Sequence, residues 1–499
     1  MSDVKLYLDG ELVDVDSKTA IVETKQINSL FDLKDRQTSF TRNFTLLLTK
    51  ETSNILDKIG HKQSVSEKPY RNLKPQLYRN GTPTITGGKF VVKSVIDSNK
   101  VKGNIQDGVV SLFDDMGSKT LSDLDFTDAN HIFSKTKLIQ SYTHEWEDIY
   151  VYPLLNCGVF ESESIDHRYQ SPAIYMKWLF EQIFKESNYT YTYRGANNPL
   201  ESEYFKTKAI TIDKGILTDV NNVVDFSLCI RSIKQKDFFK AVLQMFGLMF
   251  QKEKSTNNYE FITTKDLFTD RLGAQDLSNK LFEHRNTSFK LGNYGKVNSF
   301  KYKYDQENAD FADGSFDLDN ETLKDSATML TMPFKAPELS NDVVNNELIH
   351  DTPLFSVTRN DDGSIKDVKS KSSTPYIINI SRRYGGLSFT DTPYTGIYSL
   401  ANFEGLNFSS IIGANYSSFT SSINRAKSHT VDFELKASDV YAFDFLRLVY
   451  LAQFQRYFYC NKISNYKENK VTKVELIEIN TSALIGNEYS DDYNNDYNN

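Results

Sequence analysis

The stretch KDFFKAVLQMFGLMFQKEKSTNNYEFITT, residues 236–264, decides the fold class. Its first half predicts a short amphipathic helix at 237–247, because Phe238, Val242 and Met245 recur at helical spacing. The second half changes to the shorter period of strands. A helix followed directly by a hairpin is therefore the first structural unit that the sequence predicts.

The ends of these elements carry their own signals. Asp237 can cap the start of the helix, and Gly247 can take the left-handed backbone conformation that ends it. Residues 248–251 and 259–263 then form two strands across a polar turn at 255–258. The second strand is polar and aromatic, as expected for a strand with one exposed face.

The composition favours strands elsewhere too. The chain has 499 residues, including 34 Phe, 29 Tyr and only 11 Pro, and aromatic residues are enriched in strands. AT-rich codons would give the same bias, so both explanations stay open. A chain of this length holds several cores. We expect a mainly β (α+β) protein of several antiparallel β-barrel or sandwich domains with short helical insertions.

Net charge and cysteine usage limit the classes of function. The formal charge is -8, so tight sequence-independent binding of DNA is not expected. A mildly negative wall instead suits a conduit through which DNA slides. The three cysteines, Cys157, Cys229 and Cys460, are far apart and in no metal-binding spacing, which predicts folding in a reducing cytosol without disulfides.

Neither targeting nor membrane insertion is expected. The opening MSDVKLYLDGELVDV alternates charged and apolar residues, unlike a signal peptide. The longest nearly apolar run, residues 238–250, falls short of the ~20 residues needed to cross a bilayer.

Turn dipeptides and alternation place further elements. Asp9-Gly10 and Asn80-Gly81 predict hairpins. Alternation in SFKYKYD, residues 299–305, predicts a half-exposed strand. Residues 457–463 are expected to pair with 471–479. Ser171-Pro172 predicts the cap and first turn of a second helix, 172–186.

These signals divide the chain into five predicted parts. They are an N-terminal β domain at 1–155, an α+β domain with both helices at 156–295, a second β-rich domain at 296–440, C-terminal strands completing a barrel at 441–486, and a flexible acidic tail at 487–499.

The cluster His144-Glu145-Trp146-Glu147-Asp148 holds the densest set of potential ligands and acids. Catalytic metal sites use side chains that converge from several rigid elements, and no second histidine is close in sequence. The cluster is therefore interpreted as a solvated loop or strand edge.

An acidic run in residues 305–325 invites a calcium interpretation. The calcium-loop spacing fails, because Asp313-Gly314 is one residue out of step and Asp317, Asp319 and Glu321 lack glycine at the sixth place. A charged surface loop is the preferred interpretation.

Three other candidates carry little chemistry. Gly87-Gly88-Lys89 lacks the upstream glycine and the Ser or Thr of a phosphate-binding loop. Cys460 with His429 could be a thiol pair, but an aromatic strand around the cysteine favours a buried structural thiol. Carboxylate pairs for sugar hydrolysis stay open, since sequence does not show their separation. No catalytic, cofactor-binding or metal-binding residue is therefore assigned, and no cofactor is expected.

The segment KPYRNLKPQLYR, residues 68–79, interleaves lysine and arginine with tyrosine, as proteins that bind single-stranded nucleic acid do. On a negatively charged chain, an arm that grips an acidic neighbouring subunit is the favoured alternative.

Four stretches resemble tail hub proteins of Bacteroides phages, including the crAss-like group. They are INSLFDLKDRQTSFTRNFTLLLTKETSNIL at 27–56, PAIYMKWLFEQIFKESNYTY at 172–191, KDFFKAVLQMFGLMF at 236–250 and RYFYCNKISNYKENKVTKVELIEI at 456–479. The resemblance implies a hub of β-barrels with helical insertions that forms a ring on the tail axis. It carries no catalytic residue to this chain.

The predicted function is accordingly that of a virion structural protein and not of an enzyme. We expect a tail hub subunit, folded in the host cytoplasm, that joins other phage tail proteins, forms a homo-oligomeric or mixed ring and lets DNA pass without specific binding. Unpaired sheet edges would serve as docking elements. The alternatives are a tail-associated glycan hydrolase and a carbohydrate-binding receptor module.

Overall fold

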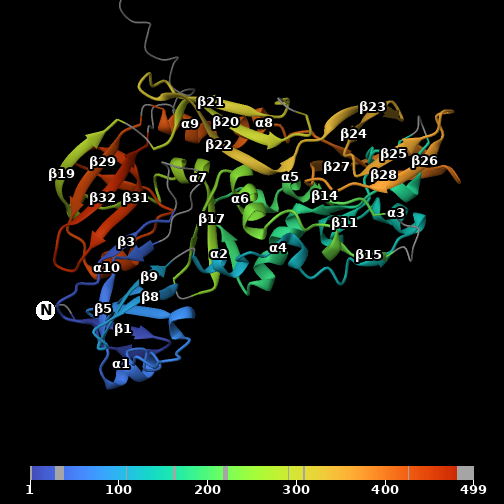
Figure 1. Ribbon diagram of the computed structural model, residues 1–499. Coiled ribbons are helices and arrows are strands. Elements are labelled where there is room, and N and C mark those ends of the chain that lie inside the picture. The colour runs from blue at the N-terminus through green and yellow to red at the C-terminus, as the bar shows by residue number, and fades with distance from the viewer. Residues whose placement is uncertain are drawn as a thin grey trace, which may run out of the picture.

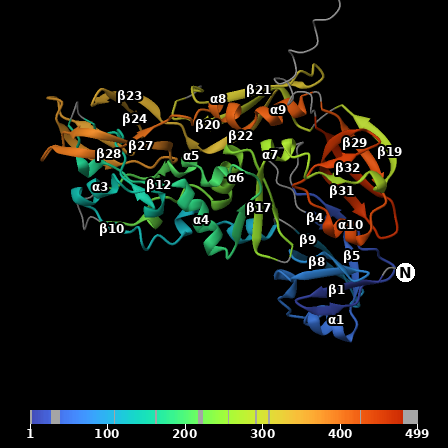
Figure 2. The same ribbon diagram turned by 180° about the vertical axis from the view of Figure 1, so that it is seen from behind.

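The computed structural model describes residues 3–27, 39–107, 110–160, 164–216, 223–254, 256–289, 292–306, 309–424 and 426–479. Most strand pairs in these ranges are antiparallel and the helices are short, so the expected mainly β fold with several antiparallel sheets is confirmed. The molecule is elongated, with the N-terminal strands at one end and a group of hairpins at the other (Figures 1 and 2). The predicted tail at 487–499 lies outside the described residues.

A four-stranded sheet of order β2-β1-β6-β7 forms one end of the molecule. Its strands are β1 (Val4–Leu8), β2 (Glu11–Val13), β6 (Pro75–Arg79) and β7 (Thr82–Ile85). Both predicted hairpin turns are confirmed. Asp9 and Gly10 have φ of 50° and 87°, and Asn80 and Gly81 have φ of 47° and 79°, the positive values that the tightest hairpin turns require. Helix α1 (Lys50–Ile55) packs beside this sheet.

The largest sheet combines the two ends of the chain. In the described ranges it contains β3 (Glu23–Lys25), β4 (Ser39–Thr41), β5 (Phe44–Leu47), β8 (Lys89–Ile96), β9 (Lys100–Asp107), β18 (Gln275–Asp276), β19 (Leu281–Ser288), β29 (Ser428–Phe433), β30 (Val449–Leu451), β31 (Arg456–Tyr466) and β32 (Thr472–Glu478). The predicted C-terminal hairpin is confirmed, with Ile463 opposite Val474. Strand β3 pairs with β31, which places Glu23 opposite Tyr466.

The helix and hairpin of residues 236–264 lie in the middle of the molecule (Figure 1). The hairpin is confirmed as β16 (Leu248–Lys252) and β17 (Asn258–Thr263), and β13 (Thr190–Tyr193) adds a parallel third strand. Beside it lie α4 (Met176–Glu186) and α6 (Gln235–Met245). The ring centroids of Phe180 and Phe239 are 5.7 Å apart, and that of Phe239 is 5.5 Å from that of Phe250, so stacked and edge-on aromatic rings fill the space between the helices and the hairpin.

Two predicted helix starts were wrong. The helix expected at 172–186 begins at Met176, because residues Ala173–Tyr175 form strand β12 and pair with β14 (Lys208–Thr211). The helix expected at 237–247 begins at Gln235 with Lys234 as its cap, so Asp237 lies inside the first turn. There its negative charge interacts favourably with the helix dipole. Gly247 has φ of 60° and ends the helix as predicted.

A five-stranded sheet and several hairpins form the other end of the molecule. The sheet has β11 (Tyr150–Val151), β12, β14, β27 (Ile377–Leu387) and β28 (Tyr394–Asn402) in that order. The hairpins are β23 (Glu338–Val344) with β24 (Glu347–Asp351) and β25 (Phe355–Arg359) with β26 (Ile365–Ser370). The short strand β10 (His131–Ile132) pairs with the distant β15 (Val223–Val224).

The remaining elements cover the middle. A sheet of order β21-β20-β22 is made of β20 (Gly295–Lys303), β21 (Gly314–Asp317) and β22 (Lys324–Lys335). In β20, Phe300 and Tyr302 are buried while Lys301 and Lys303 are exposed, which confirms the predicted alternation. The other helices are α2 (Val110–Met116), α3 (Lys135–Ser141), α5 (Glu203–Lys206), α7 (Thr264–Thr269), α8 (Phe408–Asn415), α9 (Ser417–Ile423) and α10 (Ala437–Ala442).

Buried apolar side chains form three clusters. One runs from Leu6 to Ile105, a second from Val431 to Leu476, and the largest from Leu112 to Ile479. Each cluster includes residues of the large sheet, such as Phe44, Val431 and Tyr459. The division at 155, 295, 440 and 486 stays a prediction.

Candidate functional site

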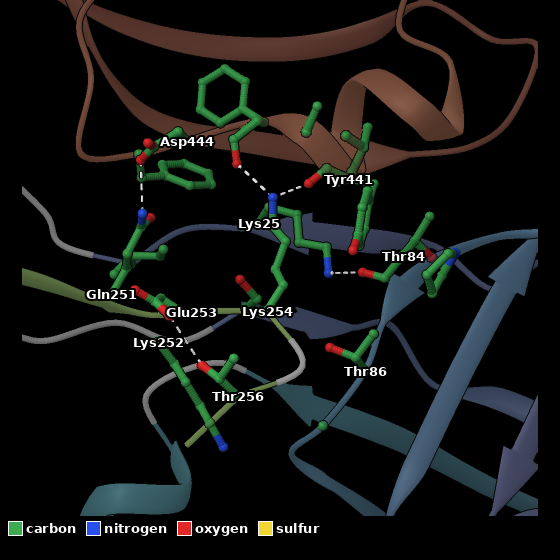
Figure 3. A pocket seen from close by; sticks show the side chains of 18 of the residues that line it. Lys25, Thr84, Thr86, Gln251, Lys252, Glu253, Lys254, Thr256, Tyr441 and Asp444 are labelled. Carbon is green, nitrogen blue, oxygen red and sulfur yellow. Dashed lines mark hydrogen bonds between the residues drawn. The ribbon is translucent and has the colours of Figure 1, made fainter. Parts of the chain in front are cut away.

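A cavity of about 630 Å³ lies where three distant parts of the chain meet (Figure 3). Strands β3 and β7 contribute one wall, hairpin β16–β17 the second, and α10 with the segment after it the third. The polar side chains that line it include Lys25, Thr84, Thr86, Arg194, Gln251, Lys252, Glu253, Lys254, Thr256, Glu260, Tyr441 and Asp444.

The two lysines in the middle of the cavity are bound to the protein itself. Lys25 donates from Nζ to the carbonyl oxygen of Thr84 at 2.7 Å. Lys254 donates to the carbonyl oxygens of Tyr441 and Phe443, the second at 3.2 Å (Figure 3). Burial of its ammonium group lowers the pKa of Lys254. These lysines therefore tie the hairpin and the N-terminal strands to their neighbours.

An ion-pair network closes one side of the cavity. Arg194 donates to both carboxylate oxygens of Glu260, at 2.9 and 2.5 Å, and its Nη2 lies 2.8 Å from Oδ2 of Asp444. Nε2 of Gln251 donates to Oδ1 of Asp444 at 2.8 Å. Half-burial of these groups strengthens the pairing relative to open water. The network joins β17, the residue after β13 and the C-terminal segment.

The cluster at 144–148 also serves the fold. His144 Nδ1 contacts the carbonyl oxygen of Tyr150 at 3.0 Å, and Asp148 accepts the backbone N–H of Glu145 at 2.9 Å. Glu145 pairs with Arg382 of β27 at 3.3 Å. These residues thus cap a short 3-10 turn and connect it to the five-stranded sheet.

The acidic residues of 305–325 point to different neighbours. Asp305 pairs with Lys335, while Asp313 accepts the backbone N–H of Tyr302 at 2.9 Å and the hydroxyl of Tyr304 at 2.6 Å. Residues 307–308 lie outside the described ranges. Within those ranges, no group of three or more His, Cys, Asp or Glu side chains is arranged to hold a metal ion.

Gly87-Gly88-Lys89 leads into strand β8. Gly88 has φ of 86°, and Lys89 pairs with Asp114 at 2.6 Å. The two glycines line the wall of the cavity, so they shape a turn there.

The structure separates Cys460 from His429. Both face Leu476 of the strand between them, so two strand spacings, about 10 Å in total, lie between their positions. His429 instead contacts Glu478 at 3.3 Å and His284 at 3.5 Å. Burial raises the pKa of the Cys460 thiol and lowers that of the His429 imidazole.

The basic segment 68–79 splits into a buried and an exposed part. Arg79 is buried and donates from Nε to Oε1 of Glu23 at 2.7 Å. Lys68 pairs with Asp9 and Arg71 with Glu67, both near the surface. Arg79 is therefore part of the fold, and the exposed basic character is confined to residues up to Lys74.

Sequence reasoning missed the buried Lys177 of α4. Its Nζ donates to Glu181 and Glu201, each at 2.8 Å, and lies 4.4 Å from the ring centroid of Trp146. The spacing of Lys177 and Glu181, four residues apart on a helix, is a local signal for half of this arrangement. The contacts with Trp146 and Glu201, and the network around Arg194, join residues with no such signal.

No protein-family model and no curated protein matches the chain. Among solved structures, the 43 kDa tail protein of prophage MuSo2 from Shewanella oneidensis aligns over 97% of this chain and 99% of its own, with 8% identity and a TM-score of 0.41. A tail protein from Neisseria meningitidis MC58 aligns over 96% and 97%, with 8% identity and a TM-score of 0.38.

The prophage tail protein gp18 from Listeria monocytogenes EGD-e aligns over 95% of this chain and 94% of its own, with 8% identity and a TM-score of 0.37. At this identity and with TM-scores below 0.5, the three likenesses do not establish the function of the chain. In the described ranges, none of the helices has the length and apolar character needed to cross a membrane.

Proposed function

We propose that the chain is a structural subunit of a phage tail. It is a tail hub protein that assembles into a ring on the tail axis, connects neighbouring tail components and surrounds the path of the DNA. The four sequence stretches that resemble tail hub proteins support this role, and two of them contribute α4, α6 and the start of β16 to the central unit.

One structural observation carries the proposal. At one end of the elongated molecule, β23 has β24 as its only strand partner among the described strands, so the outer edge of β23 is open, while the backbone of Asn156 bonds to the outer edge of β24 (Figure 1). Leu339, Val343 and Leu348 are exposed on this hairpin. Open edges and exposed aliphatic side chains are the features by which sheets dock on partner proteins.

The polar groups in the cavity are consistent with this role. Lys25, Lys254 and Arg194 bind carbonyl and carboxylate groups of the chain itself and hold three segments together. A rigid junction of this kind suits a subunit that must keep its shape inside a larger assembly.

The test is the location of the protein in phage particles. Particles produced from the genome that encodes the chain are purified on a density gradient, and the protein is located with gold-labelled antibody. We expect labelling at one fixed level of the tail and a constant ratio to other tail proteins by mass spectrometry.

Absence from purified particles would contradict the proposal. So would turnover of peptidoglycan or capsule by the purified chain, because that result would assign it to the glycan hydrolases.

A further inference from the structure

Two histidine side chains meet across neighbouring strands of the largest sheet. His284 lies on β19 and His429 on the adjacent β29 (Figure 1). Nε2 of His284 is 3.5 Å from Nδ1 of His429. The hydroxyl oxygen of Thr287 lies 3.1 Å from each of these two nitrogens. Two nitrogens and one oxygen from two strands therefore form a compact triangle of polar atoms.

A β-bulge in β19 brings His284 and Thr287 to the same face of the sheet. Residues three apart in a regular strand point to opposite faces. The register with β29 shifts between His284 and Asn286, so β19 has one additional residue there and both side chains share a face. Thr287 then lies directly opposite His429. Bulges often re-aim side chains in this way next to functional sites.

The imidazole of His429 is held in place by its surroundings. Its side chain is 8% exposed, and the ring packs edge-on against Phe454 and Phe458, with centroid distances of 5.5 and 5.4 Å. Its Nε2 lies 3.3 Å from Oε2 of Glu478. Donation of Nε2–H to this carboxylate leaves the lone pair on Nδ1, the atom that lies near His284.

The second histidine connects the triangle to the solvent. The side chain of His284 is exposed, and its ring centroid lies 5.6 Å from that of Phe454, which also contacts His429. A hydrated metal ion can therefore reach the two nitrogens from one side, while the other side is closed by aromatic rings.

The spacing of the two nitrogens matches metal coordination. Zn–N distances in proteins are about 2.0–2.1 Å, so two nitrogens on one tetrahedral zinc ion lie about 3.3–3.4 Å apart. The 3.5 Å between His284 and His429 is close to this value. A carboxylate on the other nitrogen of a ligand histidine is the usual second partner in zinc sites, and Glu478 occupies that place.

We propose that His284 and His429 bind one Zn²⁺ ion that bridges β19 and β29. The hydroxyl of Thr287 takes the third coordination position and water the fourth. The histidines are 145 positions apart in the sequence, so no spacing motif marks them. Glu478 also pairs with Lys427 at 3.9 Å and with Arg456 at 3.5 Å, so its negative charge is shared and the affinity should be modest.

The bound ion would fasten a strand at the margin of the sheet. Among the described strands, β19 pairs only with β29. An ion that binds the folded chain and not the unfolded chain stabilises the fold, and here the added stability falls on the contact between these two strands. The site goes beyond the proposed tail role and does not depend on it.

Titration of the full chain with zinc tests the site. The protein is freed of metal with EDTA, exchanged into buffer at pH 7.5 and titrated with ZnCl₂ in a calorimeter. We expect one saturable site per chain. His284→Gln changes an exposed side chain, so the fold should be kept, and it should weaken binding by about tenfold or more because one of two imidazole ligands is lost.

A matched control separates this site from other zinc binding. His61→Gln replaces another exposed histidine and should bind zinc as the wild type does. Cys157, Cys229 and Cys460 are buried, so their thiols compete little. Zinc should raise the unfolding temperature of the wild type and of His61→Gln, but much less that of His284→Gln.

Electron paramagnetic resonance with Cu²⁺ counts the ligands directly, because copper also prefers imidazole nitrogen. We expect hyperfine coupling to two nitrogens in the wild type and to one in His284→Gln. Equal zinc affinity in the wild type and His284→Gln, or no saturable zinc binding by the wild type, overturns the inference. Either result leaves the proposed function intact, since that proposal is tested by the location of the protein in particles.

Discussion

Nε of Arg79 donates to Oε1 of Glu23 at 2.7 Å, and both side chains are buried, with exposed fractions of 4% for Arg79 and 0% for Glu23. The pair joins β6 of the four-stranded sheet to β3 of the largest sheet. Thr84 donates its hydroxyl to the same carboxylate oxygen at 3.0 Å, and Lys25 lies 3.5 Å from the other. The buried carboxylate is thus the link between two sheets.

Arg79→Ala should destabilise the fold strongly. Loss of one partner of a buried ion pair leaves the other charge buried, which costs about 3–5 kcal/mol in the free energy of unfolding. Lys25 and Thr84 remain near Glu23, so we expect a value toward the lower end. Urea unfolding followed by tyrosine fluorescence measures it. Arg71→Ala breaks an exposed ion pair and should leave the midpoint unchanged; equal losses for both variants would refute the buried link.

Two glycines should respond in opposite directions to alanine. Gly247 has φ of 60°, and a Cβ there would lie 3.1 Å from the carbonyl oxygen of Asn415, so Gly247→Ala should lose about 1–2 kcal/mol. Gly413 lies inside α8 with open space around it, so Gly413→Ala should gain about 0.5–1 kcal/mol. Thermal unfolding of both variants tests the pair, and a stabilising Gly247→Ala would disprove the strained turn.

The contributions of Arg194 and Asp444 to the free energy of unfolding should be coupled. A double-mutant cycle with Arg194→Ala and Asp444→Ala should show a coupling energy of about 0.5–3 kcal/mol, because the two side chains are half-buried and in direct contact. Denaturant unfolding of the wild type, both single variants and the double variant gives the value. A parallel cycle on the surface pair Lys206 and Glu203 provides the control, with no coupling expected. Additive effects at Arg194 and Asp444 would show that they act independently.

Acid should destabilise the protein in part through His131. Its Nδ1–H donates to the carbonyl oxygen of Ala129 at 2.8 Å, and Nε2 lies 2.9 Å from the hydroxyl of Tyr152, from which the neutral ring accepts a hydrogen bond. Burial lowers the pKa of His131 in the folded state. The unfolded chain therefore binds more protons once the pH falls below about 6.5, and stability decreases from there downward.

The measurement is the free energy of unfolding between pH 7.5 and pH 5. His131→Asn should flatten this dependence without abolishing it, because burial also lowers the pKa of His167, His350 and His429. His61→Asn, at an exposed position, should retain the wild-type slope. A His131→Asn profile as steep as the wild type would exclude His131 as a contributor.

Local signals in the sequence were sufficient for the parts of the fold that depend on neighbouring residues. Asp9-Gly10 and Asn80-Gly81 form the expected turns because positive φ at two successive residues is a local requirement. The alternation in β20 follows from one buried and one exposed face, and the sequence displays it directly.

Contacts between residues far apart in the chain explain the features that the sequence did not predict. Ser171 and Pro172 carry the cap and proline signals of a helix start, yet the backbone of β14 offers residues 173–175 hydrogen bonds in a sheet. The pairs Arg79 with Glu23 and Arg194 with Asp444 join residues 56 and 250 positions apart, and the chain contains many equivalent charges. Only the folded chain selects these partners.

The pairing of β3 with β31 determines how late in synthesis the large sheet can be completed. Glu23 and Tyr466 are 443 positions apart, so β3 leaves the ribosome roughly 20–90 s before its partner at ordinary rates of translation. During that interval the edge of β3 that pairs with β31 has no partner. The large sheet is therefore completed only when synthesis is nearly finished, and a chain that ends before β31 cannot complete it.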